Sequence, residues 1–119
     1  MFKPNNKANS YKYSSFTNTT KIIGDITSTD DIRIDGYFKG NIKVQQKVVI
    51  AEKAIVNGNI EAKNISVYGK INGEIKVAQL IEIQSEAVIT DNIYTREIAV
   101  SKGGIINGKI ITTKQKDKL

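Results

Sequence analysis

The apolar residues of this chain recur in one arrangement at steps of 15 to 18 residues. Each repeat carries a triplet that ends in isoleucine and, in all but the fifth repeat, begins with glycine: Gly24-Asp25-Ile26, Gly40-Asn41-Ile42, Gly58-Asn59-Ile60, Gly73-Glu74-Ile75, Asp91-Asn92-Ile93 and Gly108-Lys109-Ile110. An apolar residue stands two positions before each triplet: Ile22, Phe38, Val56, Ile71, Ile89 and Ile106. Because the same positions are filled in the same way six times, the pattern indicates a repeat architecture.

Within each repeat the apolar residues alternate with polar ones, which is the period of a strand with one buried face. The segments have three to five residues and are too short to form stable hairpins alone. A period near 17 with about three short strands per period predicts an all-β fold, a parallel β-helix (solenoid) of about six coils of 16–18 residues. We place this domain at residues 22–113, after a flexible basic arm at 1–21 and before a short basic tail at 114–119.

Three Asn-Gly pairs favour a different fold, because Asn-Gly is a strong hairpin signal. The pairs are Asn57-Gly58, Asn72-Gly73 and Asn107-Gly108. An antiparallel sandwich or barrel would need longer arms beside each turn and would leave the repeated columns without a cause. Glycine at a solenoid corner accepts positive φ and lets neighbouring coils approach closely. Asp91 replaces this glycine in the fifth repeat and is predicted to carry local strain.

Composition limits the chemistry of the chain. Cysteine and histidine are absent, which removes disulfides, thiolate nucleophiles, imidazole bases and the usual zinc ligands. We therefore predict no enzyme, no cofactor and no metal site, although hexapeptide-repeat enzymes, which use histidine, are also β-helices. The adjacent carboxylates Asp30 and Asp31 are better explained by a turn than by acid/base catalysis.

The net charge of +6 lies in the tails, because residues 22–113 hold 11 basic and 11 acidic residues. No apolar run approaches the roughly 18 residues of a membrane span, and residues 1–21 lack the apolar centre of a secretory signal. We therefore expect the protein in the cytoplasm.

A solenoid ends in two coils whose backbone groups lack partners, and soluble repeat proteins normally cover them with a cap. Neither flank of the repeats has the pattern of an amphipathic cap. We therefore expect a second subunit to cover the terminal isoleucines, namely Ile22, Ile26, Ile32 and Ile34 at one end and Ile105, Ile106 and Ile110 at the other. The alternative is that these residues are ordinary core and the ends fray.

Two further surfaces are candidates for binding. The arm has four lysines, no acidic residue and several aromatic residues, so Met1, Phe2, Lys3 and Lys7 are predicted to bind a membrane surface. A soluble tail, or less readily a contact with single-stranded nucleic acid, would suit the same composition. A column of outward apolar residues, interrupted by Lys70, consists of Tyr37, Ile55, Val88 and Ile105. It is predicted to pair filaments laterally or to dock an envelope protein such as a cell-wall enzyme. The alternative is that these are isolated surface apolar residues, which are normal.

The repeated Ile-x-[Ile/Val] and [Gly/Ala]-x-[Ile/Val]-x-Gly-x-Ile segments, the chain length, the opening Met1-Phe2-Lys3 and the lack of a catalytic signature resemble the bactofilins. The resemblance covers residues 22–113 and, less closely, the N-terminal arm. It implies a right-handed, roughly triangular parallel β-helix that polymerises without nucleotide into filaments lacking polarity. It also implies attachment to the inner face of the cell membrane and a scaffolding role in cell shape or envelope synthesis.

The sequence departs from that family in its short C-terminal tail and in Ile105-Ile106, where an aromatic residue is often found. A β-solenoid that binds proteins without polymerising is the alternative function.

Overall fold

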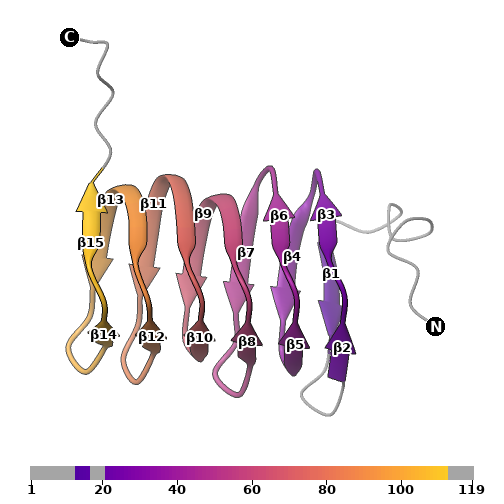
Figure 1. Cartoon of the computed structure of the whole chain (residues 1–119), viewed down its shortest axis with the longest axis horizontal. Helices are drawn as coiled ribbons and strands as arrows, with labels where there is room; N and C mark the ends of the chain where they lie inside the picture. Colours follow the sequence, from indigo (N-terminus) through magenta and orange to yellow (C-terminus); the bar gives the residue numbers. More distant parts are fainter. Residues whose placement is uncertain (1–12, 17–20, 113–119) are drawn as a thin grey trace, which may run out of the picture.

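The computed structural model describes residues 13–16 and 21–112, and within them every regular element is a β-strand (Figure 1). One sheet has six strands in the order β14-β12-β10-β8-β5-β2. These strands occupy equivalent places in successive coils: β2 (Lys21–Ile23), β5 (Tyr37–Lys39), β8 (Ile55–Asn57), β10 (Lys70–Asn72), β12 (Val88–Thr90) and β14 (Ile105–Asn107). Six rungs of one sheet therefore follow one another along the rod.

A second sheet of nine strands forms the other two sides of the coils. In the first two coils each side has its own short strand: β3 (Ile26–Ser28), β4 (Asp31–Ile34), β6 (Ile42–Val44) and β7 (Lys47–Ile50). In the next three coils the two sides merge into one strand: β9 (Ile60–Val67), β11 (Ile75–Ile83) and β13 (Ile93–Val100). In this sheet the last coil is represented only by β15 (Ile110–Thr112). Three short strands per coil are thus found at the N-terminal end, whereas a shift of register between Val77 and Leu80 marks the corner in the merged strands.

Every strand pair is parallel, and partners are equivalent residues of adjacent coils. Ile71 of β10 lies opposite Val56 on one side and Ile89 on the other. Lys76 likewise lies opposite Glu61, which lies opposite Lys43, so opposite charges stack along the rod. The predicted parallel β-solenoid is therefore confirmed, and the antiparallel alternative is wrong.

The core is one continuous column of aliphatic side chains inside the coils. Its largest fully buried members are one phenylalanine and eleven isoleucines: Phe38, Ile34, Ile42, Ile50, Ile60, Ile65, Ile71, Ile75, Ile81, Ile83, Ile89 and Ile93. β-Branched residues suit a pleated surface that is buried on one face. Each such side chain contributes about 1.5–3 kcal/mol when it is fully buried. Stacking therefore stabilises coils that could not bury their apolar face alone.

The glycine corners explain how closely the coils approach. Gly40, Gly58 and Gly73 have φ values of 143°, 150° and 158°. A Cβ atom on any of them would overlap the carbonyl oxygen of the corresponding glycine in the preceding coil. Asp91 takes the same corner with φ 121°, so the predicted strain at this residue is observed.

At four corners the polar residue after the corner connects one coil to the next, namely Asp25, Asn41, Asn59 and Asn92. Asp25 Oδ1 accepts a hydrogen bond from the backbone N–H of Asn41 at 2.9 Å. Asn41 Oδ1 accepts from Asn59 N at 3.2 Å, and Asn59 Oδ1 accepts from Glu74 N at 3.0 Å. These side chains satisfy backbone donors at the corners, where the sheet ladder is interrupted.

The structure differs from expectation at β1 (Tyr13–Phe16), which lies in the segment predicted to be a flexible arm. This strand pairs in parallel with β4, with Ser14 opposite Ile32 and Phe16 opposite Ile34. β4 is the first strand on its side of the solenoid, and its open backbone groups form a template that an extended segment can pair with. The rest of the arm, at 1–12 and 17–20, and residues 113–119 lie outside the described residues.

Candidate assembly surfaces at the ends and side of the solenoid

The C-terminal rung exposes side chains that belong to the core columns. Ile110 is 43% exposed, whereas Ile93, one coil earlier in the same column, is 0% exposed. Val100 is 49% exposed, although Ile83 beside it is fully buried. Ile106 is half-buried. The cause is stacking on one side only, because β14 pairs only with β12 and β15 only with β13.

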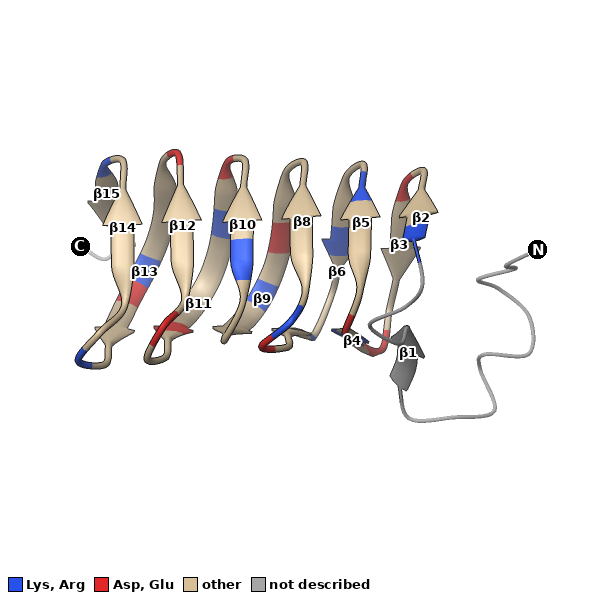
Figure 2. Cartoon of the chain, turned by 90° about the horizontal axis from the view of Figure 1, so that it is seen from below, with Lys and Arg blue, Asp and Glu red and all other residues tan. Residues whose placement is uncertain are grey.

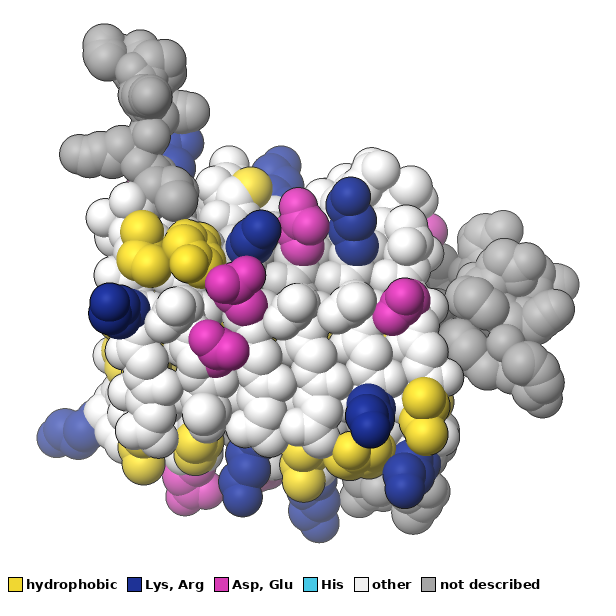
Figure 3. Space-filling model, in the orientation of Figure 1, with side chains coloured by type: hydrophobic (Ala, Val, Ile, Leu, Met, Phe, Trp, Pro, Cys, Tyr) yellow, Lys and Arg dark blue, Asp and Glu magenta, His cyan; other side chains and the backbone are white. Residues whose placement is uncertain are grey.

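A space-filling view of the rod shows hydrophobic side chains near this C-terminal end (Figure 3). Val100 and the half-buried Ile98 belong to the same open end, but we did not assign them to it from sequence. The signal was present, because Ile98/Val100 is the last apolar pair of the third column and no later repeat follows it. The open end thus has apolar side chains on all three sides of the coil.

The N-terminal end is less exposed than the sequence suggested. Ile26, Ile32 and Ile34 are buried, with 4%, 3% and 1% exposure, and β1 lies on the strand that carries the latter two. Ile22 alone among the four predicted residues is half-buried, and its outward neighbour Ile23 is 70% exposed. β2 and β3 each have a partner strand on one side only. The two ends of the rod therefore differ, and the C-terminal end is the more apolar.

The predicted outward column lies in one line on the six-stranded sheet. Tyr37 stands opposite Ile55, Lys70 stands between Ile55 and Val88, and Val88 stands opposite Ile105. Ile55 and Ile105 are 37% and 50% exposed. Seen from this side, the strands are mostly uncharged, with basic residues on β10 and at the N-terminal end (Figure 2). Ile105 belongs both to this line and to the open rung, so the two surfaces meet there.

Tyr37 is held in place by polar contacts. Its hydroxyl accepts a hydrogen bond from Asn57 Nδ2 at 2.9 Å, and Lys21 Nζ lies 5.3 Å from the centroid of its ring. Asn72 Nδ2 in turn donates to Asn57 Oδ1 at 2.9 Å. This end of the column is therefore an ordered surface with both apolar and polar character.

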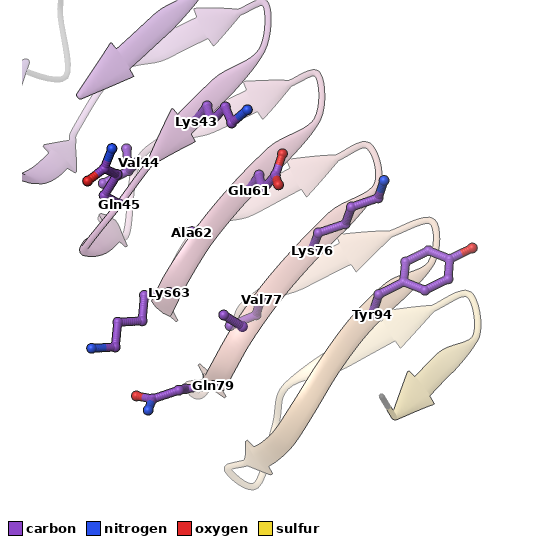
Figure 4. A pocket seen from close by; sticks show the side chains of 11 residues that line it. Lys43, Val44, Gln45, Glu61, Ala62, Lys63, Lys76, Val77, Gln79 and Tyr94 are labelled. Carbon is purple, nitrogen blue, oxygen red and sulfur yellow. The ribbon is translucent and has the colours of Figure 1, made fainter. Parts of the chain in front are cut away.

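A groove of about 780 Å³ crosses β6, β9, β11 and β13 on another outer face (Figure 4). The side chains of Lys43, Glu61, Lys76 and Tyr94 follow one another along it, each from the next coil. Its apolar lining comes largely from residues that also belong to the core, such as Val77. The groove contains a stacked row of charges but no pairing of a nucleophile with a base.

Several acidic residues of the described part have structural contacts, among them Asp25, Asp35 and Asp91. Asp31 Oδ1 accepts a hydrogen bond from Lys47 N at 3.0 Å, and the Asp30 backbone lies in a turn with Ser28. Within residues 13–16 and 21–112 no group of three acidic side chains is placed to hold a metal ion. None of the described residues forms a helix long and apolar enough to cross a membrane.

A parallel β-solenoid with an uncovered apolar rung has the architecture of a self-associating structural protein. The family model for bactofilins, described as polymer-forming cytoskeletal, matches residues 14–111. The match covers most of the chain and includes part of β1, so the chain belongs to the bactofilin family, which is a structural and not an enzymatic family. No curated protein and no solved structure matches the chain.

Proposed function

We propose that this chain is a filament subunit that assembles end to end, without nucleotide, through the terminal rungs of its solenoid. The observation that carries the proposal is the contrast within one column, where Ile110 is 43% exposed and Ile93 is fully buried. A second rung placed on Ile110, Ile106 and Val100 would give each of them the environment that its equivalents already have. It would also pair the open backbone edges of β14 and β15.

The energetics favour a contact that uses all three sides of the coil. Association costs an estimated 4–15 kcal/mol of translational and rotational freedom. Complete burial of one isoleucine returns about 1.5–3 kcal/mol, and these side chains are already half covered. Several side chains and the strand pairing must therefore act together. This requirement explains why a single charge at the rung should prevent assembly.

Assembly without nucleotide is supported by the composition of the chain. The glycines belong to the repeat, where those that open the triplets stand 15 to 18 residues apart or a multiple of that, and no segment of the sequence has the spacing of a phosphate-binding glycine loop. The filament would then form from folded subunits alone.

Electron microscopy and sedimentation of the purified chain, without nucleotide, test the proposal. Filaments are expected for the native chain and for Tyr68→Lys, which places the same charge on a 42% exposed side chain in the middle of the rod, away from both proposed surfaces. Ile110→Lys is expected to remain unassembled. Normal filaments of Ile110→Lys, checked to be folded by circular dichroism, would contradict the proposal.

The filament is further proposed to lie at the inner face of the cell membrane and to serve as a scaffold for envelope or cell-shape machinery. Met1, Phe2, Lys3 and Lys7 lie outside the described residues, so the argument rests on their chemistry. Each lysine near an anionic surface contributes about 1 kcal/mol, and insertion of Phe2 about 1.5–3 kcal/mol. One arm is a weak anchor, but many arms on one filament act together.

Co-sedimentation with liposomes tests the anchor. Deletion of residues 1–3 should release filaments from anionic vesicles, and uncharged vesicles provide the control. Undiminished binding after the deletion would exclude this role for the N-terminus.

The line of Tyr37, Ile55, Val88 and Ile105 supports a second role, which is lateral pairing or the docking of a cell-wall enzyme or another envelope protein. Its apolar side chains lie in register on one face. A photocrosslinker at Ile55 in cells would trap the chain itself or a partner. No adduct in cells that contain filaments would count against a binding role. The polymer-forming character of the family favours self-assembly over a solenoid that only binds other proteins.

A further inference from the structure

Asn-Gly pairs occupy the same place in three coils of this solenoid. Asn57 lies opposite Asn72 in adjacent coils, and Asn107 lies opposite Thr90. Each pair follows a β-branched residue, and the tripeptides are Val56-Asn57-Gly58, Ile71-Asn72-Gly73 and Ile106-Asn107-Gly108. Two of the tripeptides have identical sequence. Any difference in their chemistry must therefore come from the surrounding coils or from more distant residues.

Asparagine before glycine is prone to deamidation, because glycine has no side chain to hinder the attacking nitrogen. The backbone nitrogen of the glycine loses its proton and attacks Cγ of the asparagine. A C–N bond forms, ammonia leaves with the side-chain nitrogen, and a five-membered succinimide results. Water then opens the ring at either carbonyl and yields aspartate or isoaspartate. The balance is asparagine and water to acid and ammonia, so no enzyme or cofactor is needed.

The two inner pairs are protected by the next coil. Gly58 N donates a hydrogen bond to the carbonyl oxygen of Asn72 at 3.0 Å, and Gly73 N donates to that of Thr90 at 3.1 Å. The attacking nitrogen is therefore already engaged in both cases. The side-chain amides are engaged as well, because Asn57 Nδ2 donates to Tyr37 and Asn72 Nδ2 donates to Asn57.

The last pair has support from one side only. The carbonyl oxygen of Asn107 accepts a hydrogen bond from Asp91 N at 3.0 Å, which ties it to the preceding coil. Among the described residues no backbone carbonyl accepts from Gly108 N, because no strand lies beyond β14. Asn107 is exposed, and Thr90 beneath it carries no amide that would extend the asparagine ladder. The nitrogen and the amide that react are thus both accessible.

We propose that Asn107 is a site of spontaneous deamidation, selective over Asn57 and Asn72, and that the modification inactivates the C-terminal rung for assembly. The second half rests on the proposed function. The product places a negative charge next to the half-buried Ile106. In isoaspartate the backbone also gains one carbon, which displaces β14 from the register that a further rung would require.

Peptide mass spectrometry of the full-length chain, aged at mildly alkaline pH, tests the site. Dilute protein that does not sediment is used, and deamidation is quantified at all three positions. Asn107 should react about tenfold faster than Asn72, on the order expected when hydrogen bonds to a neighbouring coil are missing. In denaturant the two identical tripeptides should react at similar rates. Equal rates at Asn72 and Asn107 in the folded chain would overturn the proposed site.

Aged filaments and two variants test the consequence for assembly. In filaments Asn107 should be protected, since a further rung would engage Gly108 N. Asn107→Asp should sediment less than Asn107→Gln, which keeps the amide but forms the cyclic intermediate far more slowly. Equal assembly of the two variants would overturn the inactivation. Selective reaction at Asn107 that is equally fast in filaments would leave the site intact and instead contradict stacking at this rung.

Discussion

Gly24 and Gly40 have nearly the same backbone conformation, with φ values of 140° and 143°, but different surroundings. A Cβ atom at Gly40 would overlap the carbonyl group of Gly24, whereas a Cβ atom at Gly24 has no atom within 4 Å. The difference arises because Gly24 stands in the first coil that the structure describes, so no equivalent glycine of an earlier coil lies against it. The need for glycine therefore has two origins at Gly40, positive φ and close stacking, and only the first at Gly24.

Substitution of these two glycines by alanine should separate the two origins. Gly24→Ala is expected to cost about 1–3 kcal/mol of unfolding free energy, which is the usual strain of an L-residue in this conformation. Gly40→Ala should cost more, or prevent folding, because the coils must also separate. Urea unfolding of both variants, made in a non-assembling background, measures the difference. Equal losses would mean that stacking adds nothing to the requirement.

Asp91→Gly should stabilise the chain by about 0.5–1 kcal/mol. Asp91 has φ 121°, which glycine adopts without strain, although the hydrogen bond from Asn92 N to Asp91 Oδ1 at 2.7 Å is lost. Asp91→Asn keeps both the strain and an acceptor oxygen and serves as the control, with little change expected. A thermal melt that places the glycine variant below the native chain would show that the side chain of Asp91 is worth more than its strain costs.

Alanine substitutions at Ile93 and Ile110 should separate effects on stability from effects on assembly, because the two residues occupy the same column in adjacent coils. Ile93→Ala is expected to lower the unfolding free energy by about 2–5 kcal/mol through the cavity that it leaves. Ile110→Ala removes a side chain that is 43% exposed and should cost the isolated subunit less than about 1.5 kcal/mol. Denaturation and sedimentation are measured on both variants. A loss of filaments in Ile110→Ala without a large loss of stability is the expected result.

Truncation of the N-terminal segment should reveal the contribution of β1. Removal of residues 1–20 exposes the edge of β4 and is expected to destabilise the chain and to speed hydrogen exchange of amides in Asp31–Ile34. Removal of residues 1–12 keeps β1 and provides the matched control, with native exchange rates in β4. Identical exchange in both truncations would show that β1 contributes nothing to the stability of this edge.

The repeat, the inward columns and the glycine corners were predictable from the sequence, because each coil uses its residues in the same way. Ile71 lies between Val56 and Ile89 as the column of apolar residues requires. Even the strained corner at Asp91 followed from its place in the glycine column. Such features are local and recur in every repeat, so they can be predicted from the pattern of a single repeat.

The ends of the rod were less predictable, because the exposure of their apolar side chains depends on which segments pair with the edge strands. The segment Tyr13–Phe16 lies outside the repeat, so the sequence gave no sign that it would pair with β4. Ile32 and Ile34, which the sequence places at an open end, are buried in the subunit itself. The merging of two sides into β9, β11 and β13 was also unforeseen, since the continuity of a strand through a corner depends on its pairing with the neighbouring coils.

The sequence by itself determined the solenoid and its core, because an alternating pattern repeated every 15 to 18 residues can bury its isoleucines only against copies of itself. Only the tertiary structure decided which isoleucines remain uncovered. Ile93 and Ile110 have the same place in the repeat, and one is buried and the other exposed because, within the part of the chain that the structure describes, a coil stacks beyond the first and none beyond the second.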